Sequence, residues 1–481
     1  MSRRRVVRAV IATCSAVLVA GCTTTLQGQA VSVFDDPFHV AGMPASDGPT
    51  GLRPDAHSPV RDVDGTDNGQ IDELAANAVS DIEEYWSNAY SETFDGQFSP
   101  VKALISWDAN GFDDTPFCDE DTYGLVNAAF CYDDETIGWD RGELLPALRK
   151  SYGDMGMTMV LAHEYGHAVQ HQAGLKSEDT PTLVAEQQAD CFAGAYMRWV
   201  AEDKSPRFTL STGEGLNNVL AAVIAFRDPL LSEGDPEVGF DEHGSAFERL
   251  SAFQFGFTDG PSACAAVDMR EIGQRRGDLP VLLPEDQTGE LPVSEESVRS
   301  IIDAMGVMFS PAKPPRLSFK AAEAQGCPVA RPSPPASYCP ATNTIVVDLA
   351  ELEVMGTQSD SEDGGLASGD NTAYSVLVSR YMQAIQHERG GVVLDNAEAA
   401  LRTACLTGVA TVKMSKNVTT PDGNTIALTA GDVDEAVSGI LTNGLAASDV
   451  NGESVPSGFS RIDAFRVGVL GDQDRCFKRF P

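Results

Sequence analysis

The chain has 481 residues, of which 42% are hydrophobic, a composition typical of soluble globular proteins and long enough for two or three domains. Its 71 acidic residues outnumber its 34 basic residues, and the formal net charge is −37. Such a charge repels the phosphate backbone of DNA or RNA, and no basic stripe with interleaved aromatic residues offsets it. The composition therefore argues against nucleic acid as a partner.

The first 21 residues have the features of an export signal. Four arginines flank the start of an apolar run at 9–20, which is too short to cross a bilayer as a permanent helix. The run ends in VAGC at 19–22, which resembles the lipobox of bacterial lipoproteins, although an ordinary secretory signal or a twin-arginine signal is an alternative. We expect residues 1–21 to be removed. Acylated Cys22 would then hold the mature protein on the extracytoplasmic face of the cell membrane.

The rest of the chain contains two copies of one domain. Residues 22–69 are rich in Gly, Pro, Asp and Ser without periodicity, and this composition predicts a flexible tether. VLAHEYGHAVQHQAG (160–174) then aligns without a gap with VLVSRYMQAIQHERG (376–390). Four further pairs of segments match in the same order: 78–91 with 297–310, 129–145 with 337–353, 185–195 with 399–409, and 245–264 with 458–476. We interpret 70–270 and 294–481 as a tandem duplication joined by a linker at 271–293.

Each copy is expected to contain two disulfides. Besides Cys14 in the signal and Cys22, the chain has eight cysteines, an even number that suits an exported protein. Equivalent cysteines in two copies of a domain should find equivalent partners, although a crossed pattern is an alternative. The pattern within copies pairs Cys118 with Cys131, Cys191 with Cys264, Cys327 with Cys339, and Cys405 with Cys476.

The first copy contains the motif HExxH at 163–167. Positions i and i+4 of a helix share one face, so His163 and His167 can bind one metal ion. Glu164 lies beside that ion, where it can take a proton from an attacking water. Apolar neighbours can bury the helix, and Gly174 suits its C-terminal cap. The motif predicts a metal-dependent hydrolase.

A catalytic zinc site needs a third protein ligand. Glu186 follows His167 in a second predicted helix, and Asp190 falls on the same face one turn later. We expect Glu186 to complete the ligand set and Asp190 to hold the free ring nitrogen of a ligating histidine. The alternative is an acidic patch on a solvated helix face. The apolar residues around Cys191 argue against it, because an unpaired carboxylate is costly to bury.

Three segments resemble signature blocks of the bacterial putative neutral zinc metallopeptidase family, namely HEYGHAVQ, AEQQADCFAG and HGSAFERLSAFQFGF. The resemblance covers roughly residues 70–270 and is to a lipoprotein form of actinobacterial type. It implies a mainly helical domain with small β elements and a gluzincin-type HExxH…Glu site that holds one zinc ion. The sequence departs from the usual pattern at Ala185 and at Phe247-Glu248, none of which is a proposed ligand.

The second copy lacks the residues assigned to chemistry and has other residues at the equivalent positions: Ser379, Arg380, Gln383, Ala400 and Ala404. His243 is also replaced, by Val455, and is therefore a candidate donor to the oxyanion formed in peptide hydrolysis; the alternative is a surface histidine in a loop. Four residues persist in both copies and are interpreted as packing or capping residues: Tyr165, Gln170, His171 and Gly174. We expect zinc to bind only the first copy.

Together these features favour a lipid-anchored zinc metallopeptidase that hydrolyses peptide bonds outside the cytoplasm. Its expected partners are a peptide or protein substrate, the membrane through its lipid, and an envelope protein for the second, degenerate copy. The alternative is a non-catalytic envelope adaptor lipoprotein with a structural metal site and a peptide-binding second domain. A structural site has no use for a base at Glu164, and this favours the enzyme.

Overall fold

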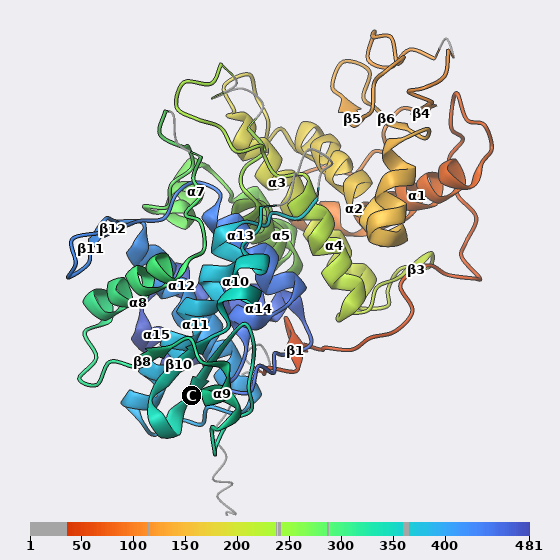
Figure 1. Cartoon of the computed structure of the whole chain (residues 1–481). Helices are drawn as coiled ribbons and strands as arrows, with labels where there is room; N and C mark the ends of the chain where they lie inside the picture. The colour runs from red at the N-terminus through yellow and green to blue at the C-terminus, as the bar shows by residue number, and fades with distance from the viewer. Residues whose placement is uncertain (1–35, 113–114, 237, 239–241, 286–287, 359–364) are drawn as a thin grey trace, which may run out of the picture. The chain divides into compact units, whose positions relative to one another are not determined.

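The computed structural model describes residues 36–481 apart from 113–114, 237, 239–241, 286–287 and 359–364 (Figure 1). The described residues belong to one compact unit. The predicted signal peptide at 1–21 and the predicted lipidation site Cys22 lie outside the described residues. Among the helices in the described part of the chain, none has both the length and the apolar character needed to cross a bilayer.

The first copy is mainly helical, as predicted, with short strands. Its helices are α1 (Gln70–Thr93), α2 (Leu144–Ala173), α3 (Thr182–Ala201), α4 (Glu214–Ala225), α5 (Ala246–Asp259) and α6 (Pro261–Ala265). Its main strands are β4 (Leu104–Trp107), β5 (Ala128–Cys131) and β6 (Thr136–Asp140), and shorter ones are β1 (His39–Val40), β2 (Met43–Pro44), β3 (Gly51–Leu52) and β7 (Phe208–Thr209). Helix α7 (Met269–Arg276) follows.

The second copy has a matching series of elements. Its helices are α8 (Glu295–Phe309), α9 (Ala321–Gln325), α10 (Leu349–Met355), α11 (Asp370–Arg389), α12 (Ala397–Met414), α13 (Asp432–Thr442), α14 (Gly458–Val469) and α15 (Gln473–Arg479). Its strands are β8 (Arg316–Ser318), β9 (Ala336–Cys339), β10 (Thr344–Val347), β11 (Val418–Thr419) and β12 (Thr425–Ile426). Short 3₁₀ turns lie at Pro340–Thr342 and Leu445–Ala447.

The three-stranded sheets of the two copies have the same topology. In the first copy β6 is the central strand, parallel to β4 and antiparallel to β5. In the second copy β10 is central, parallel to β8 and antiparallel to β9. Helix α2 is kinked at Gly153, whose φ of 74° suits glycine, and the two parts of α2 correspond in order to α10 and α11. This repeated topology is what a tandem duplication predicts.

A close crossing of α3 and α5 places the helix that carries Glu186. A Cβ atom at Gly194 would overlap the carbonyl oxygen of Phe253, and one at Gly256 would overlap that of Cys191. Only glycine permits this approach. Helices α12 and α14 meet in the same way in the second copy, through Gly408 and Gly468.

All four predicted disulfides are present and lie within copies. Cys118 pairs with Cys131, Cys191 with Cys264, Cys327 with Cys339, and Cys405 with Cys476. The second of these joins α3 to α6, and the fourth joins α12 to α15 at the equivalent place. The argument from matched cysteines is confirmed, and the crossed alternative is wrong.

The expected tether differs from the structure in its described part. Residues 36–69 include β1, β2 and β3, and β3 pairs with β7 of the first copy. Arg61 Nη1 lies 2.5 Å from Glu83 Oε1 on α1, and Ser46 N donates to Thr212 Oγ1 at 3.0 Å. The prediction of a flexible tether rested on composition alone. Composition gives no information about these contacts, because they join residues far apart in sequence. Part of the expected linker is also ordered, since it includes most of α7.

The two copies pack against each other through α5 and α14. Gln254 Nε2 donates to the carbonyl oxygen of Phe459 at 3.0 Å, and the rings of Phe257 and Phe459 are 5.0 Å apart. Asn217 on α4 accepts a hydrogen bond from the backbone N–H of Gly458 at 2.8 Å. Buried apolar residues from both copies form one continuous cluster. The second copy therefore shares its core with the first.

Candidate metal centre

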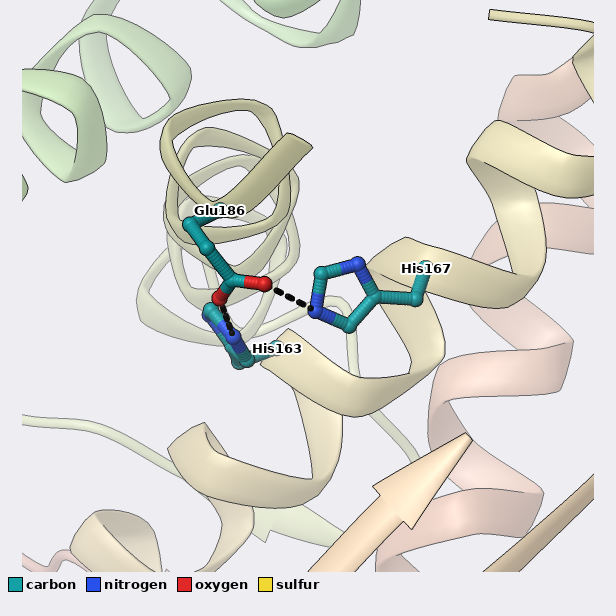
Figure 2. Close-up of side chains that lie close together, drawn as sticks. All are labelled: His163, His167 and Glu186. Atoms are coloured by element: carbon teal, nitrogen blue, oxygen red, sulfur yellow. Dashed lines mark hydrogen bonds and ion pairs between the residues drawn. The ribbon is translucent and has the colours of Figure 1, made fainter. Parts of the chain in front are cut away.

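Helices α2 and α3 bring the three predicted ligands together (Figure 2). His163 and His167 lie one turn apart on α2, and Glu186 projects from α3 between them. Glu186 Oε2 is 3.0 Å from His163 Nε2, and Glu186 Oε1 is 3.4 Å from His167 Nε2. All three side chains are buried. The predicted ligands therefore form one preassembled cluster.

The donor atoms of this cluster suit a zinc ion. Ligands about 2.0–2.2 Å from a tetrahedral zinc lie roughly 3.3–3.6 Å from one another, and the three donor atoms here lie within 4.8 Å of one another. Two imidazoles and one carboxylate make up a ligand set found in catalytic zinc sites. Burial opposes ionisation of Glu186, yet His167 and His163 hold its pKa well below its usual range. An ionised carboxylate facing two imidazole nitrogens fits a cation.

A buried ion pair between Asp190 and Arg249 supports His163 at its Nδ1 atom. Asp190 Oδ1 lies 2.8 Å from His163 Nδ1. Arg249 on α5 donates to both oxygens of Asp190, at 2.9 Å and 2.7 Å, and also to the carbonyl oxygen of Phe226. Burial opposes ionisation of Asp190, but Arg249 and His163 lower its pKa. The ionised Asp190 accepts the Nδ1 proton and leaves the lone pair of His163 Nε2 free for a metal.

Gln170 supports His167 in the same way. Gln170 Oε1 lies 2.9 Å from His167 Nδ1, and Gln170 Nε2 donates to Ala185 O at 2.6 Å and to Gln188 Oε1 at 3.0 Å. Gln170 was predicted only to pack, and the structure adds this contact with a ligand. Tyr165 is a packing residue as predicted, because it is buried and its hydroxyl bonds Glu83. His171, also predicted to pack, has an exposed side chain whose ring lies near that of Phe130. Gly174 caps α2 in the left-handed conformation, as predicted.

Glu164 faces the cavity beside the ligand cluster. The backbone N–H of Phe130 on β5 donates to Glu164 Oε2 at 3.3 Å. Burial raises the pKa of the Glu164 carboxyl, and His163 and His167 partly offset this effect. A carboxylate whose pKa is raised toward neutrality is better suited to accept and release a proton.

His243 lies at the edge of the cluster, in the segment between α4 and α5. Its Nε2 is 3.7 Å from Glu186 Oε2, and its Nδ1 is 3.4 Å from Asp228 Oδ1. Asp228 also accepts the backbone N–H groups of His243 and Gly244, at 3.0 Å and 2.7 Å. The His243 side chain is 43% exposed, so it is open to a ligand as well as close to the cluster. The hydrogen bond to Asp228 raises the pKa of His243.

A cavity of about 700 Å³ opens onto the cluster. His163, Glu164 and His243 line it together with apolar residues of α2 and α4, including Met159, Val160 and Ala225. Cavities of this size and composition are typical of ligand sites. A substrate in this cavity would contact both the proposed base and a proposed metal ligand.

Residues 35–267 match the model of the family described as putative neutral zinc metallopeptidase. This part of the chain is similar to that family. The match begins before residue 70, which agrees with the packed structure of residues 36–69. His163, Glu164, His167, Glu186 and His243 all lie inside the matched region.

Two relatives of the chain have names that describe them as uncharacterized proteins. An uncharacterized protein of Mycobacterium tuberculosis H37Rv is 27% identical over 170 residues, which cover 31% of this chain and 57% of that protein. The uncharacterized protein YpfJ of Escherichia coli K12 is 31% identical over 129 residues, which cover 23% of this chain and 43% of YpfJ. The chain thus spans about half the length of the curated relatives it matches. No solved structure matches the chain significantly.

In the second copy, a buried guanidinium stands at the position of Glu164, the proposed base of the first copy. Arg380 Nε donates to Ala336 O on β9 at 2.7 Å, and its Nη1 donates to Ser448 Oγ at 2.9 Å. Gln383 Nε2 donates to the carbonyl oxygens of Ser448 and Asp449 at 3.1 Å and 2.9 Å. Burial lowers the pKa of Arg380 to about 10, so the side chain is still a cation at neutral pH. The buried cation Arg380 therefore disfavours a metal cation at the place in the second copy that corresponds to the His163, Glu164 and His167 motif.

Three residues that support the candidate metal centre were missed from sequence. Gln170 stands three residues after His167, but its persistence in the second copy pointed to packing. Arg249 lies in the third signature block and was noted only as part of it. Asp228 belongs to no recognised motif. Its role depends on its position beside His243 in the folded chain. The replacement of Asp190 by Ala404 could have signalled a cationic partner such as Arg249.

Proposed function

We propose that the chain is a zinc-dependent metallopeptidase that hydrolyses peptide bonds outside the cytoplasm. The observation that carries the proposal is the position of Glu164, a carboxylate with a raised pKa that faces the cavity beside the His163, His167 and Glu186 cluster. A purely structural metal site is closed and needs no such base. Similarity to the family supports the same reaction.

Zinc, when bound by His163, His167 and Glu186, supplies Lewis-acid polarisation of the scissile carbonyl. Glu164 takes a proton from the attacking water and passes it to the nitrogen of the leaving amine. Asp190 and Gln170 hold the Nδ1 atoms of the two histidines, so that both Nε2 lone pairs point to the same place. The peptide C–N bond breaks, and the products are a carboxylic acid and an amine.

His243 is proposed as the donor to the oxyanion that forms during this attack. Asp228 fixes both its ring and its backbone, and the exposed ring can reach a substrate in the cavity. A positioned donor of this kind stabilises the transition state because it needs no reorganisation when the charge develops. Asp228 acts through His243 and is a positioning residue.

The full chain should bind one zinc ion and cleave peptides. Elemental analysis should find one zinc per chain, and a chelator should abolish hydrolysis of a diverse peptide library until zinc is restored. His163→Ala should lose the metal, whereas His387→Ala, on the equivalent helix α11, should keep it. A zinc-loaded chain that cleaves no peptide in the library would contradict the enzyme and support the adaptor alternative.

We also propose that Cys22 carries a lipid and anchors the protein to the cell membrane. The proposal rests on the VAGC sequence at 19–22 and is consistent with four disulfides, which form in oxidising compartments. Cys22→Ala should shift the protein from the membrane fraction to the soluble fraction or leave an unprocessed precursor. Cys14→Ala is the matched control and should remain anchored. Normal processing and membrane retention of Cys22→Ala would show the proposal to be wrong.

A further inference from the structure

A second cavity of about 540 Å³ adjoins the cavity at the metal centre. The two cavities share six lining residues from the end of α4 and the segment between α4 and α5: Ala225, Arg227, Asp228, Pro229, Leu231 and Glu242. Because both cavities lie against the same residues, a single ligand that passes over these residues would occupy both. We call the joined space the inter-copy groove.

The far end of the inter-copy groove is walled by the second copy. Residues Ala367 and Ser368, just before α11, and Val433 on α13 line it. The connecting segment 279–282 lines a further side, with the apolar sequence LPVL. Leu230 and Val281 are each 44% exposed there. Large apolar side chains left open to solvent along a groove are typical of a binding surface.

Hydrogen bonds from both copies hold the walls of the groove in place. Arg227 Nη1 donates to the carbonyl oxygen of Gly365 at 2.8 Å, and Phe247 N donates to Asp434 Oδ1 at 3.2 Å. The connecting segment is fixed by the backbone, since Leu283 N donates to Leu231 O at 2.9 Å. These bonds tie the first copy, the connector and the second copy together where the groove passes between them.

The charged groups of the far end are largely engaged by the protein itself. Glu248 pairs with Arg276 at 2.8 Å, Asp434 accepts the N–H of Phe247, and Glu435 accepts the N–H of Asn371 at 2.7 Å. Among the residues of the far end, the apolar side chains of Leu230 and Val281 are thus left open to a ligand. Apolar side chains are the natural occupants, because removing apolar surface from water is favourable.

We propose that the inter-copy groove binds an extended, apolar polypeptide segment whose scissile bond lies at the metal centre. The inference rests on the proposed function, and it assigns to the degenerate second copy one wall of the substrate site. An extended chain is the occupant that suits two joined cavities, because its side chains can fill pockets along the groove while its backbone crosses the ligand cluster. The substrate class is thus an unfolded or flexible apolar stretch of polypeptide and excludes free dipeptides.

Peptide binding to the full-length, zinc-loaded Glu164→Gln variant tests the groove apart from catalysis. Fluorescence anisotropy would compare a labelled ten-residue apolar peptide with a four-residue truncation and with a ten-residue peptide whose apolar residues are replaced by Ser. We expect the long apolar peptide to bind on the order of tenfold more tightly than either. Ala367→Trp should fill the far end and remove that advantage.

Val354→Trp is the matched control, because Val354 is 77% exposed on α10 of the second copy and does not line the groove. It should leave binding of all three peptides unchanged. Equal affinities for the three peptides would show that the proposed groove is wrong, even if the wild type hydrolyses peptides. An affinity for the long apolar peptide that Ala367→Trp leaves unchanged would show the same. Conversely, tight binding with no hydrolysis by the wild type would contradict the proposed function alone.

Discussion

Glu164→Gln is expected to lower peptide hydrolysis by a factor on the order of 10²–10⁴, the usual contribution of a positioned acid–base group. Glutamine keeps the shape of the side chain and can still accept the N–H of Phe130, but it cannot take the proton from water. The ligand atoms of His163, His167 and Glu186 are untouched, so zinc content should not change. The measurement is kcat/KM on one cleavable peptide together with elemental analysis of the same sample.

A matched control lies on the equivalent helix of the second copy. Glu388→Gln makes the same chemical change on α11, at an exposed position, and should leave both zinc and kcat/KM as in the wild type. Glu186→Ala should differ from both variants, because it removes a ligand and should lose metal together with activity. Full activity in Glu164→Gln would exclude it as the base, whatever the metal content.

Much of the ligand cluster could be predicted because the spacing of its residues within a short stretch of sequence indicates that they lie together. His163 and His167 are one helical turn apart, so the helix alone brings them together. Glu186 required a second helix and was supported by the family resemblance and by its replacement with Ala400 in the second copy. The structure confirms that all three meet in one cluster.

The disulfides could be predicted because the chain contains two copies of one domain, so that the cysteines of one copy can be compared with those of the other. Eight cysteines alone leave the pairing open, but two copies of one fold must place equivalent cysteines at equivalent distances. The repeated close crossings of α3 with α5 and of α12 with α14 show why the pattern holds: each crossing is needed to bring its pair of cysteines together.

The remaining features depend on contacts between distant segments. Asp228 bonds the backbone of His243, 15 residues away in sequence, and Arg249 bonds Asp190, 59 residues away. Residues 36–69 were predicted to be flexible because their composition is polar, yet they pack through hydrogen bonds to positions more than 100 residues away, such as that from Ser46 to Thr212. Composition and periodicity describe local preferences, and they contain no signal for such contacts.

The second copy shows how the fold persists after the site is lost. Ser379 and Arg380 stand where His163 and Glu164 stand, and Arg380 is fully buried. Its guanidinium donates to carbonyl and hydroxyl oxygens of β9 and of the loop at 445–449, and these hydrogen bonds offset part of the cost of burying its charge. Because this copy also lines the inter-copy groove, loss of its site does not make it dispensable for the first copy.

Arg249→Met is expected to destabilise the protein by about 3–5 kcal/mol, because it removes one partner of a buried ion pair and leaves the other without its counter-charge. Asp190 is fully buried and receives two hydrogen bonds from Arg249, so its ionised form would lose most of its support. Denaturant or thermal unfolding of the zinc-free protein measures the loss. Arg299→Met is the control, since its pair with Glu295 is exposed and its removal should cost less than about 1 kcal/mol.

The buried pair of Asp190 and Arg249 should also affect zinc affinity, because Asp190 holds His163. A change in zinc affinity distinguishes support of the metal ligand from a general effect on protein stability. Asp190→Asn keeps the size of the side chain but removes the charge that holds His163 Nδ1, and zinc affinity should fall by about 10–100-fold. The double variant Asp190→Asn/Arg249→Met should be less destabilised than the sum of the single variants, because each change removes the same interaction. If Arg249→Met unfolds no more readily than Arg299→Met, the buried pair contributes nothing, and Asp190 must hold His163 without it.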